Sequence, residues 1–128
     1  DVTPFGLTGR QAESAMRDAG VTLNRNSLPF DTNGPWYTSG LRIGTPALTT
    51  LGMGKGEMRE IASVTKLVLS NTRARKITRG KSAGSISKAR YRTDEAALNE
   101  ARSRVADLLG RFTVYPELDL EYLQRSFG

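Results

Sequence analysis

Apolar residues recur at helical spacing in three stretches of this chain, and each stretch predicts a helix with one buried face. The first helix follows Thr8, which has the spacing of a capping box with Gln11, and it ends at Gly20. The second runs over residues 57–71, and the third begins at a Thr93 cap. The apolar positions on their inner faces are Ala12, Ala15, Met16 and Ala19, then Met58, Ile61, Ala62, Val64, Leu67 and Val68, and finally Leu98, Ala101, Val105, Leu108, Leu109 and Phe112.

Two shorter stretches predict strands, at residues 21–24 and 38–44. The Pro- and Gly-marked stretch 27–35 between them predicts a loop. Thr45 is placed to cap a further short helix that starts at Pro46 and stops at Gly52. Helices alternating with short strands indicate an α/β domain of α+β type, with a small, mainly antiparallel or mixed sheet covered by helices.

The second predicted strand carries an arginine in an unusual setting. Leu41 and Ile43 point to one side of it, so Arg42 points to the other, between Gly40 and Gly44. A guanidinium held on a strand end, with small neighbours, suits fork-like binding of a carboxylate or phosphate. The alternative is a structural ion pair with an acidic residue elsewhere in the fold.

The loop before this strand is a second candidate site. Asn26 offers an acceptor and two donors, which suit an amide-like ring edge, and Leu28, Phe30 and Trp36 could form apolar walls for a flat ligand. The alternative is a turn in which Asn26 satisfies the backbone and the aromatic side chains cover the core.

Composition excludes several classes of site. The sequence has no cysteine and no histidine, so disulfides, Ser-His-Asp triads and zinc sites built on those ligands are excluded within it, and we expect no metal. No apolar run approaches the roughly 20 residues that span a bilayer. We expect no membrane partner and a cytoplasmic location, which the lack of cysteine permits.

The net charge of +6 is concentrated in residues 73–92, which hold eight basic residues and no acidic one. These charges exceed the net charge, so the rest of the chain is slightly acidic. The same stretch is rich in glycine and serine and shows no periodicity, which predicts a basic flexible linker over 72–92. It lacks the interleaved aromatic residues of a single-strand binder, so we do not expect nucleic acid as a partner.

Three segments together closely resemble the C-terminal small domain of serine hydroxymethyltransferase. They are VTLNRNSLPFD at 21–31, GPWY at 34–37 and TSGLRIGTPALTTLG at 38–52. The resemblance covers most of residues 1–71 and, more loosely, 91–116. It implies the small C-terminal domain of a fold-type I pyridoxal-phosphate enzyme that transfers a one-carbon unit between serine and tetrahydrofolate.

The resemblance also implies roles for single residues. Arg42 matches the arginine that binds the carboxylate of the amino-acid substrate, beside pyridoxal phosphate. Asn26 matches an asparagine at the pterin of tetrahydrofolate, while Gly34, Pro35 and Trp36 match residues beside its aminobenzoyl group. Several family members have serine where Gly34 stands, so a hydroxyl contact to folate is not available here.

The same resemblance predicts the organisation of the chain. Residues 1–71 form the core of the small domain, 72–92 the basic linker, and 93–128 a C-terminal helical segment. The Schiff-base lysine belongs to an N-terminal pyridoxal-phosphate domain outside this sequence, so this fragment contributes no catalytic residue and is expected to be inert alone. The intact enzyme is expected to be a homodimer or homotetramer.

Two other functions remain open at this point. One is a related folate-independent pyridoxal-phosphate aldolase or transaldolase, favoured only by Gly34 and distinguished by testing folate-dependent turnover. The other is a non-catalytic module that binds a polyanion or partner through residues 73–92, recognisable by salt-sensitive binding that disappears when this segment is deleted.

Overall fold

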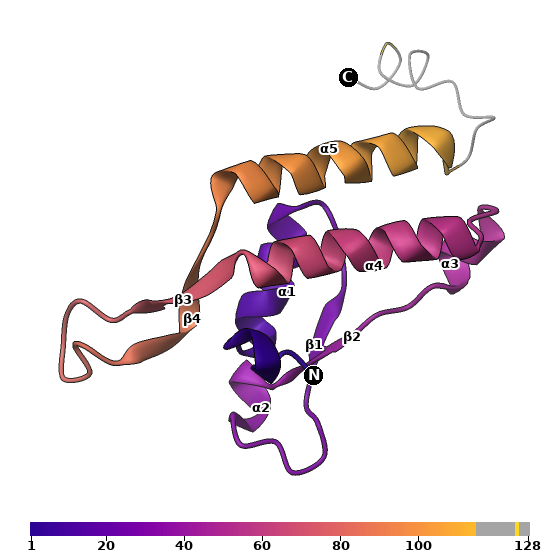
Figure 1. Ribbon diagram of the computed structural model, residues 1–128. Helices are drawn as coiled ribbons and strands as arrows, with labels where there is room; N and C mark the ends of the chain where they lie inside the picture. The colour runs from indigo at the N-terminus through magenta and orange to yellow at the C-terminus, as the bar shows by residue number, and fades with distance from the viewer. Residues whose placement is uncertain (115–124, 126–128) are drawn as a thin grey trace.

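The computed structural model describes residues 1–114 and residue 125, and within this range it has an α+β fold (Figure 1). Two antiparallel two-stranded sheets pair β1 with β2 and β3 with β4. The expected α+β class is confirmed, with two small sheets in place of one. In chain order the elements are a 3-10 turn at Thr3–Phe5, α1 (Gly9–Asp18), β1 (Asn24–Asn26), α2 (Gly34–Tyr37), β2 (Gly40–Arg42), α3 (Pro46–Thr50), α4 (Lys55–Ser70), β3 (Thr72–Lys76), β4 (Ile86–Thr93) and α5 (Glu95–Arg111).

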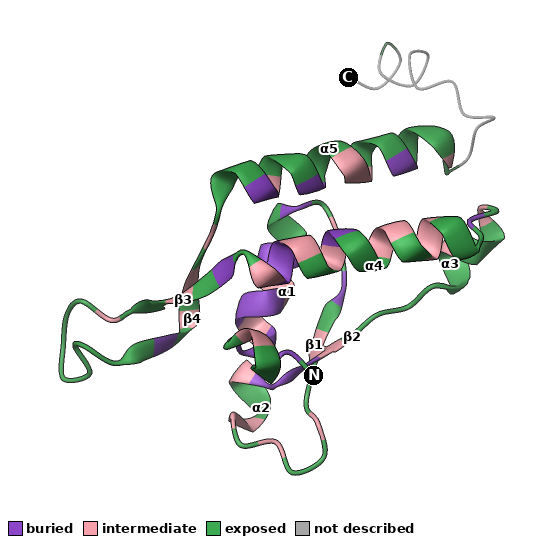
Figure 2. Ribbon diagram, in the orientation of Figure 1, coloured by how far each residue is buried: buried purple, intermediate pink, exposed green. Residues whose placement is uncertain are grey.

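Helix α1 lies at the centre of the fold, in contact with α4 and with strands of both sheets. The predicted capping box is present, with the Thr8 side chain accepting from the Gln11 backbone and the Gln11 side chain accepting from the Thr8 backbone. The small residues on its inner face let neighbouring elements approach closely, and this face is buried (Figure 2). The core includes Ala12, Ala15, Met16, Ala19, Val64, Val68, Leu69 and Ala101.

The stretch predicted to be a linker over 72–92 instead forms a β-hairpin, β3–β4, so this part of the prediction is corrected. Thr72 and Tyr91 turn toward the core, whereas all eight basic residues of 73–92 are exposed. Glycines with positive φ, Gly80 and Gly84, allow the chain to turn between the strands. The glycine- and serine-rich composition therefore belongs to the connection between the two strands of the hairpin.

Gln11 anchors this hairpin to α1. Its side chain is 1% exposed, and its Nε2 donates to the carbonyl oxygens of Ser87 (2.6 Å) and Arg90 (2.9 Å). The Thr8 hydroxyl donates to the carbonyl of Lys88 at 2.7 Å. These bonds hold an irregular part of β4, where the pairing with β3 shifts register.

We expect Gln11→Ala to lower the free energy of unfolding by about 2–3 kcal/mol, because two carbonyls of the hairpin and one backbone N–H lose their buried partner. Urea unfolding measures this change. Asn99→Ala, at an exposed position of α5, is the control and should change stability by less than about 0.5 kcal/mol. Equal effects of the two substitutions would contradict the anchoring role of Gln11.

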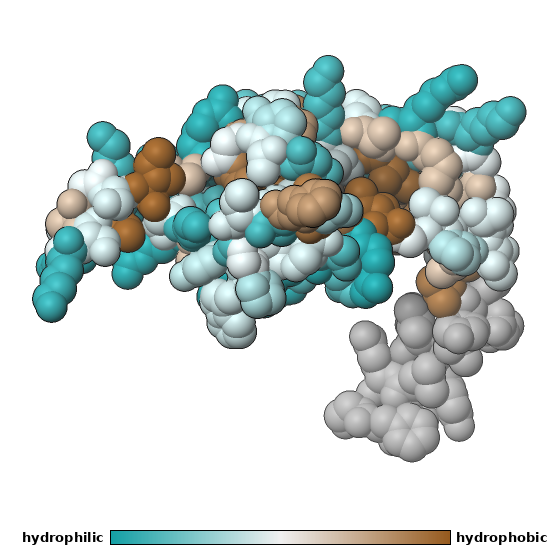
Figure 3. All heavy atoms as spheres, turned by 90° about the horizontal axis from the view of Figure 1, so that it is seen from below, coloured by the Kyte–Doolittle hydropathy of each residue, from teal (hydrophilic) through white to brown (hydrophobic). Residues whose placement is uncertain are grey.

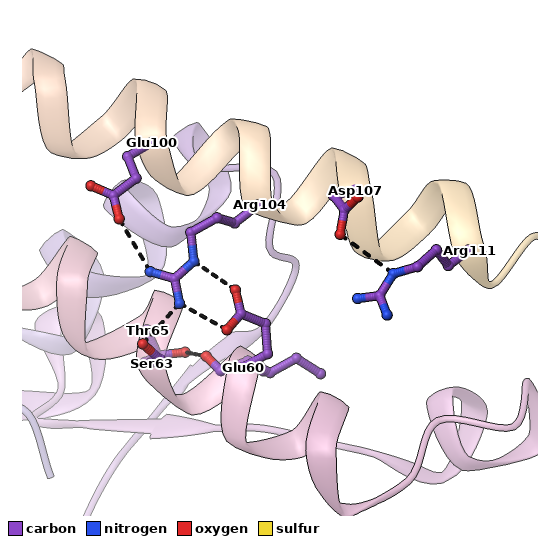
Figure 4. A network of polar contacts seen from close by, with 8 residues as sticks. Glu60, Ser63, Thr65, Glu100, Arg104, Asp107 and Arg111 are labelled. Atoms are coloured by element: carbon purple, nitrogen blue, oxygen red, sulfur yellow. Dashed lines mark hydrogen bonds and ion pairs between the residues drawn. The ribbon is translucent and has the colours of Figure 1, made fainter.

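Helix α5 packs along α4, and a polar network joins the two (Figure 4). Arg104 donates to both carboxylate oxygens of Glu60, at 2.6 and 2.9 Å, and to the hydroxyl of Ser63. This pairing lowers the pKa of Glu60 and raises that of Arg104. The bidentate geometry fixes how α5 lies on α4.

Two predicted caps are wrong. Asp94, not Thr93, caps α5 by accepting from the backbone N–H of Ala97, because the Thr93 hydroxyl is bonded to that of Thr72 across the hairpin. Thr45 stands at the N-cap of α3, but its side chain makes no capping bond. Of the predicted C-terminal helical segment 93–128, residues 115–124 and 126–128 lie outside the described residues.

Candidate functional site

The β1–β2 sheet brings the two main candidate residues onto one face. Asn24 is opposite Arg42 and Asn26 is opposite Gly40, so the side chains of Asn24, Asn26 and Arg42 project to the same side of the sheet. Strand β1, at Asn24–Asn26, lies later than the predicted 21–24, and β2, at Gly40–Arg42, lies within the predicted 38–44 and is shorter. Arg25 projects to the opposite side, where it pairs with Glu13 of α1 at 2.7 Å.

Arg42 is exposed and has no acidic partner among residues 1–114 and 125. Its Nη2 lies 3.2 Å from the side-chain oxygen of Asn24 when that amide is oriented to satisfy both groups. One neutral contact leaves most of the five donors of the guanidinium available. Within the described part of the chain, the ion pair considered as the structural alternative is not found.

The other side of β2 is apolar. Leu41 and Ile43 border a cavity of about 680 Å³ whose wall continues on α4 through Met58 and Ile61. On the face shown in Figure 3, hydrophobic residues form separate patches among hydrophilic side chains. The strand therefore separates an apolar surface from the polar face that carries Arg42.

The loop between the strands is organised around the carboxylate of Asp31. Its Oδ2 accepts from the backbone N–H groups of Ser39 (2.7 Å) and Leu28 (3.2 Å). Its Oδ1 accepts from the Ser39 hydroxyl (2.6 Å) and from the backbone N–H of Asn33 (2.9 Å). Sequence reasoning did not assign Asp31 a role. An aspartate in a loop commonly accepts a hydrogen bond from the backbone N–H two residues later, which here is that of Asn33, and this pattern is a known turn signal.

These hydrogen bonds lower the pKa of Asp31 to about 2, chiefly through the Ser39 hydroxyl and then the backbone of Asn33. Because the folded pKa lies below the ordinary value of 3.8, the stabilisation is present above about pH 4 and is lost as the pH falls through 2. We expect the emission of Trp36, the single tryptophan of the chain, to change over this window, and Asp31→Asn to lack that transition. Asp107→Asn, at an exposed position, is the control; an unaltered profile in Asp31→Asn would contradict the account.

The candidate folate-binding residues lie in or next to the loop that Asp31 organises. Asn26 is exposed and its Nδ2 donates to the Ser27 carbonyl at 2.8 Å. Gly34 begins α2 at φ +72°, a conformation that favours glycine, although a Cβ there would meet no atom within 4 Å. Room for a Cβ therefore exists, and the positive φ of the backbone accounts for the glycine.

Trp36 and Phe30 are both exposed, at 61% and 100%. The guanidinium groups of Arg10 and Arg25 lie 5.2 and 5.6 Å from the centre of the Trp36 ring, close enough for cation–π contact. Leu28 instead packs against Gly40, where a Cβ would come within 2.6 Å of Leu28 Cδ2. The structure thus leaves the two aromatic side chains exposed, whereas Leu28 is half-buried against Gly40.

No helix of the described residues is long and apolar enough to cross a membrane. In the same residues, no cluster of three or more acidic, histidine or cysteine side chains could hold a metal ion.

Comparison with known proteins adds the family context. The sequence model of the family described as serine hydroxymethyltransferase matches residues 1–65. A protein of Treponema pallidum named serine hydroxymethyltransferase is 55% identical over 127 residues, which are 99% of this chain and 21% of the relative. One of the same name from Chlamydia muridarum is 51% identical over 123 residues, 96% of this chain and 24% of the relative. The chain thus spans a fifth to a quarter of the length of these relatives.

Proposed function

Because this chain belongs to the serine hydroxymethyltransferase family, we propose that it supplies two binding elements to an enzyme that interconverts serine and glycine. These elements are the arginine that binds the substrate carboxylate, Arg42, and the part of a tetrahydrofolate site formed by Asn26, Gly34, Pro35 and Trp36. The observation that carries the proposal is the exposed Arg42 on the same sheet face as Asn26, without an acidic partner in residues 1–114 and 125.

The proposed role of Arg42 is orientation. Pyridoxal phosphate, when bound, withdraws electrons from the α-carbon of the amino acid and so weakens the bonds to it. A guanidinium that holds the carboxylate with two parallel hydrogen bonds limits rotation of the substrate and thereby selects which bond of the α-carbon is aligned to break. The exposed guanidinium, which has no acidic partner in the described residues, fits that task, whereas the cofactor itself is proposed to be held by the rest of the enzyme.

The proposed folate site uses polar and apolar groups in different ways. The amide of Asn26 has both donor and acceptor capacity for the pterin edge, and its one described bond is to a backbone carbonyl next to it. Pro35 and Trp36 offer exposed surface for the aminobenzoyl group, and Gly34 can contribute backbone contacts.

Asn26→Ala in the longer enzyme is expected to raise KM for tetrahydrofolate about tenfold, the cost of hydrogen bonds left unmade, while the affinity for serine stays within about twofold. Steady-state kinetics with each substrate varied in turn measures this split. Asn99→Ala, at an exposed position of α5, is the control. Turnover without tetrahydrofolate, unaffected by Asn26→Ala, would contradict the folate proposal and favour the folate-independent aldolase.

The assembly is proposed on the same grounds. Since the chain covers only 21–24% of the relatives, the proposed enzyme includes a larger pyridoxal-phosphate domain. As the family resemblance implies, the enzyme is proposed to be a homodimer or homotetramer in the cytoplasm.

A further inference from the structure

Thr38, four residues before Arg42, has a conformation that is costly for its residue type. Its backbone has φ +55° and ψ 173°, close to a region that almost only glycine adopts. The side chain is 4% exposed, and its hydroxyl is buried without a hydrogen-bond partner in the described residues. A β-branched residue at such a position persists only where its surroundings hold it there.

Two sets of hydrogen bonds hold this residue in place. Backbone bonds join Thr38 to α1 and α2: the N–H of Gly9 donates to the Thr38 carbonyl at 3.0 Å, and the Thr38 N–H donates to the Gly34 carbonyl at 2.9 Å. The other set comes from Asp31, which accepts from both the backbone N–H and the hydroxyl of Ser39. The Asp31 carboxylate thus joins the backbone of the loop 27–35, at Leu28 and Asn33, to the residue that follows Thr38, and the Asn33 side chain adds a bond to the hydroxyl of Ser39.

We propose that Asp31 is a positioning residue that holds Thr38 in its strained conformation and thereby sets Arg42 relative to Asn26. Ser39 leads directly into Gly40–Arg42, and Gly40 is paired with Asn26, so a shift at Ser39 moves both candidate binding residues. This inference rests on the proposed function, because it concerns where the two substrates bind.

The test uses the longer enzyme with its cofactor and compares Asp31→Asn, Thr38→Gly and the double variant. Asparagine keeps one acceptor oxygen and its amide nitrogen cannot accept, so Asp31→Asn loses the bond from either the Ser39 N–H or the Ser39 hydroxyl. We expect it to weaken binding of both serine and tetrahydrofolate on the order of ten- to a hundredfold. In the double variant, glycine adopts φ +55° without strain, and we expect at least half of the loss, on a logarithmic scale, to be recovered. Thr38→Gly alone should bind both substrates within about threefold of the parent protein.

A second readout does not depend on activity. Hydrogen exchange followed by mass spectrometry should show faster exchange of the amides of Leu28, Asn33 and Ser39 in Asp31→Asn than in the parent. Asp107→Asn, which changes an exposed carboxylate, is the matched control and should leave exchange and binding unchanged. If Asp31→Asn fails to fold, Ser39→Ala removes only the hydroxyl bonds, and we expect a severalfold loss of binding of both substrates.

The outcomes separate this inference from the proposed function. If Arg42→Ala abolishes serine binding but folded Asp31→Asn, or Ser39→Ala in its place, binds both substrates like the parent, the inference is overturned and the proposed function stands. The inference is also overturned if Asp31→Asn binds both substrates weakly and the double variant with Thr38→Gly binds them no better. If Arg42→Ala and Asn26→Ala both bind like the parent, the proposed function itself fails.

Discussion

Replacement of Arg42 by alanine in the longer enzyme is expected to lower kcat/KM for serine at least about a hundredfold. The exposed guanidinium has no acidic partner in the described residues, so its removal costs the fold little and removes the proposed carboxylate contact. Arg42→Lys keeps the charge but loses the planar fork, and we expect an intermediate loss. Steady-state kinetics measures both effects, and the visible absorbance of the bound cofactor should be retained.

Arg75→Ala is the matched control, because Arg75 is another exposed strand arginine but belongs to the other sheet. It should leave kcat/KM unchanged. Equal losses in Arg42→Ala and Arg75→Ala would mean that general electrostatics, and not a specific contact, underlies the effect.

Gly9→Ala is expected to destabilise the chain by about 3 kcal/mol or more, the largest effect on stability that we predict. A Cβ at Gly9 would lie 2.1 Å from the Thr38 hydroxyl oxygen and 2.7 Å from the Gly40 carbonyl oxygen, and the second atom belongs to the backbone of β2. Relief of this clash requires α1 and β2 to move apart. Urea unfolding measures the loss.

Gly56→Ala is the control for this prediction, because Gly56 lies in the first turn of α4 and a Cβ there meets no atom within 4 Å. Since alanine favours the helix, this substitution should be neutral or stabilise by up to about 1 kcal/mol. A Gly9→Ala protein as stable as the parent would show that α1 and β2 are not as closely packed as described.

Local signals made α1 and α4 predictable from the sequence. The capping box at Thr8 and Gln11 and the small apolar face of α1 lie within a few residues of one another, so no distant contact was needed to recognise them. The hairpin was missed because its pairing is non-local. Thr72 and Thr93 pair across the hairpin although they are 21 residues apart. The many basic residues between them make the alternation of inward and outward positions hard to recognise in the sequence.

The direction in which Arg42 projects was also predictable from local sequence. The alternation around Arg42 correctly predicted that it projects away from Leu41, and the register with β1 then added that it shares a face with Asn26. Local patterns could not show the conformation of Thr38, since it depends on a carboxylate seven residues earlier and on the close approach of Gly9. The strand therefore starts at Gly40, two residues later than predicted.

The most direct test of the central claim compares the binding of serine and of serine amide to the longer enzyme, in the parent protein and in Arg42→Ala. The amide lacks the carboxylate that Arg42 is proposed to hold. We expect the parent to prefer serine on the order of a hundredfold and the variant to bind both ligands with similar, weak affinity. If Arg42→Ala keeps the preference of the parent, Arg42 does not bind the substrate carboxylate, and the central claim is wrong.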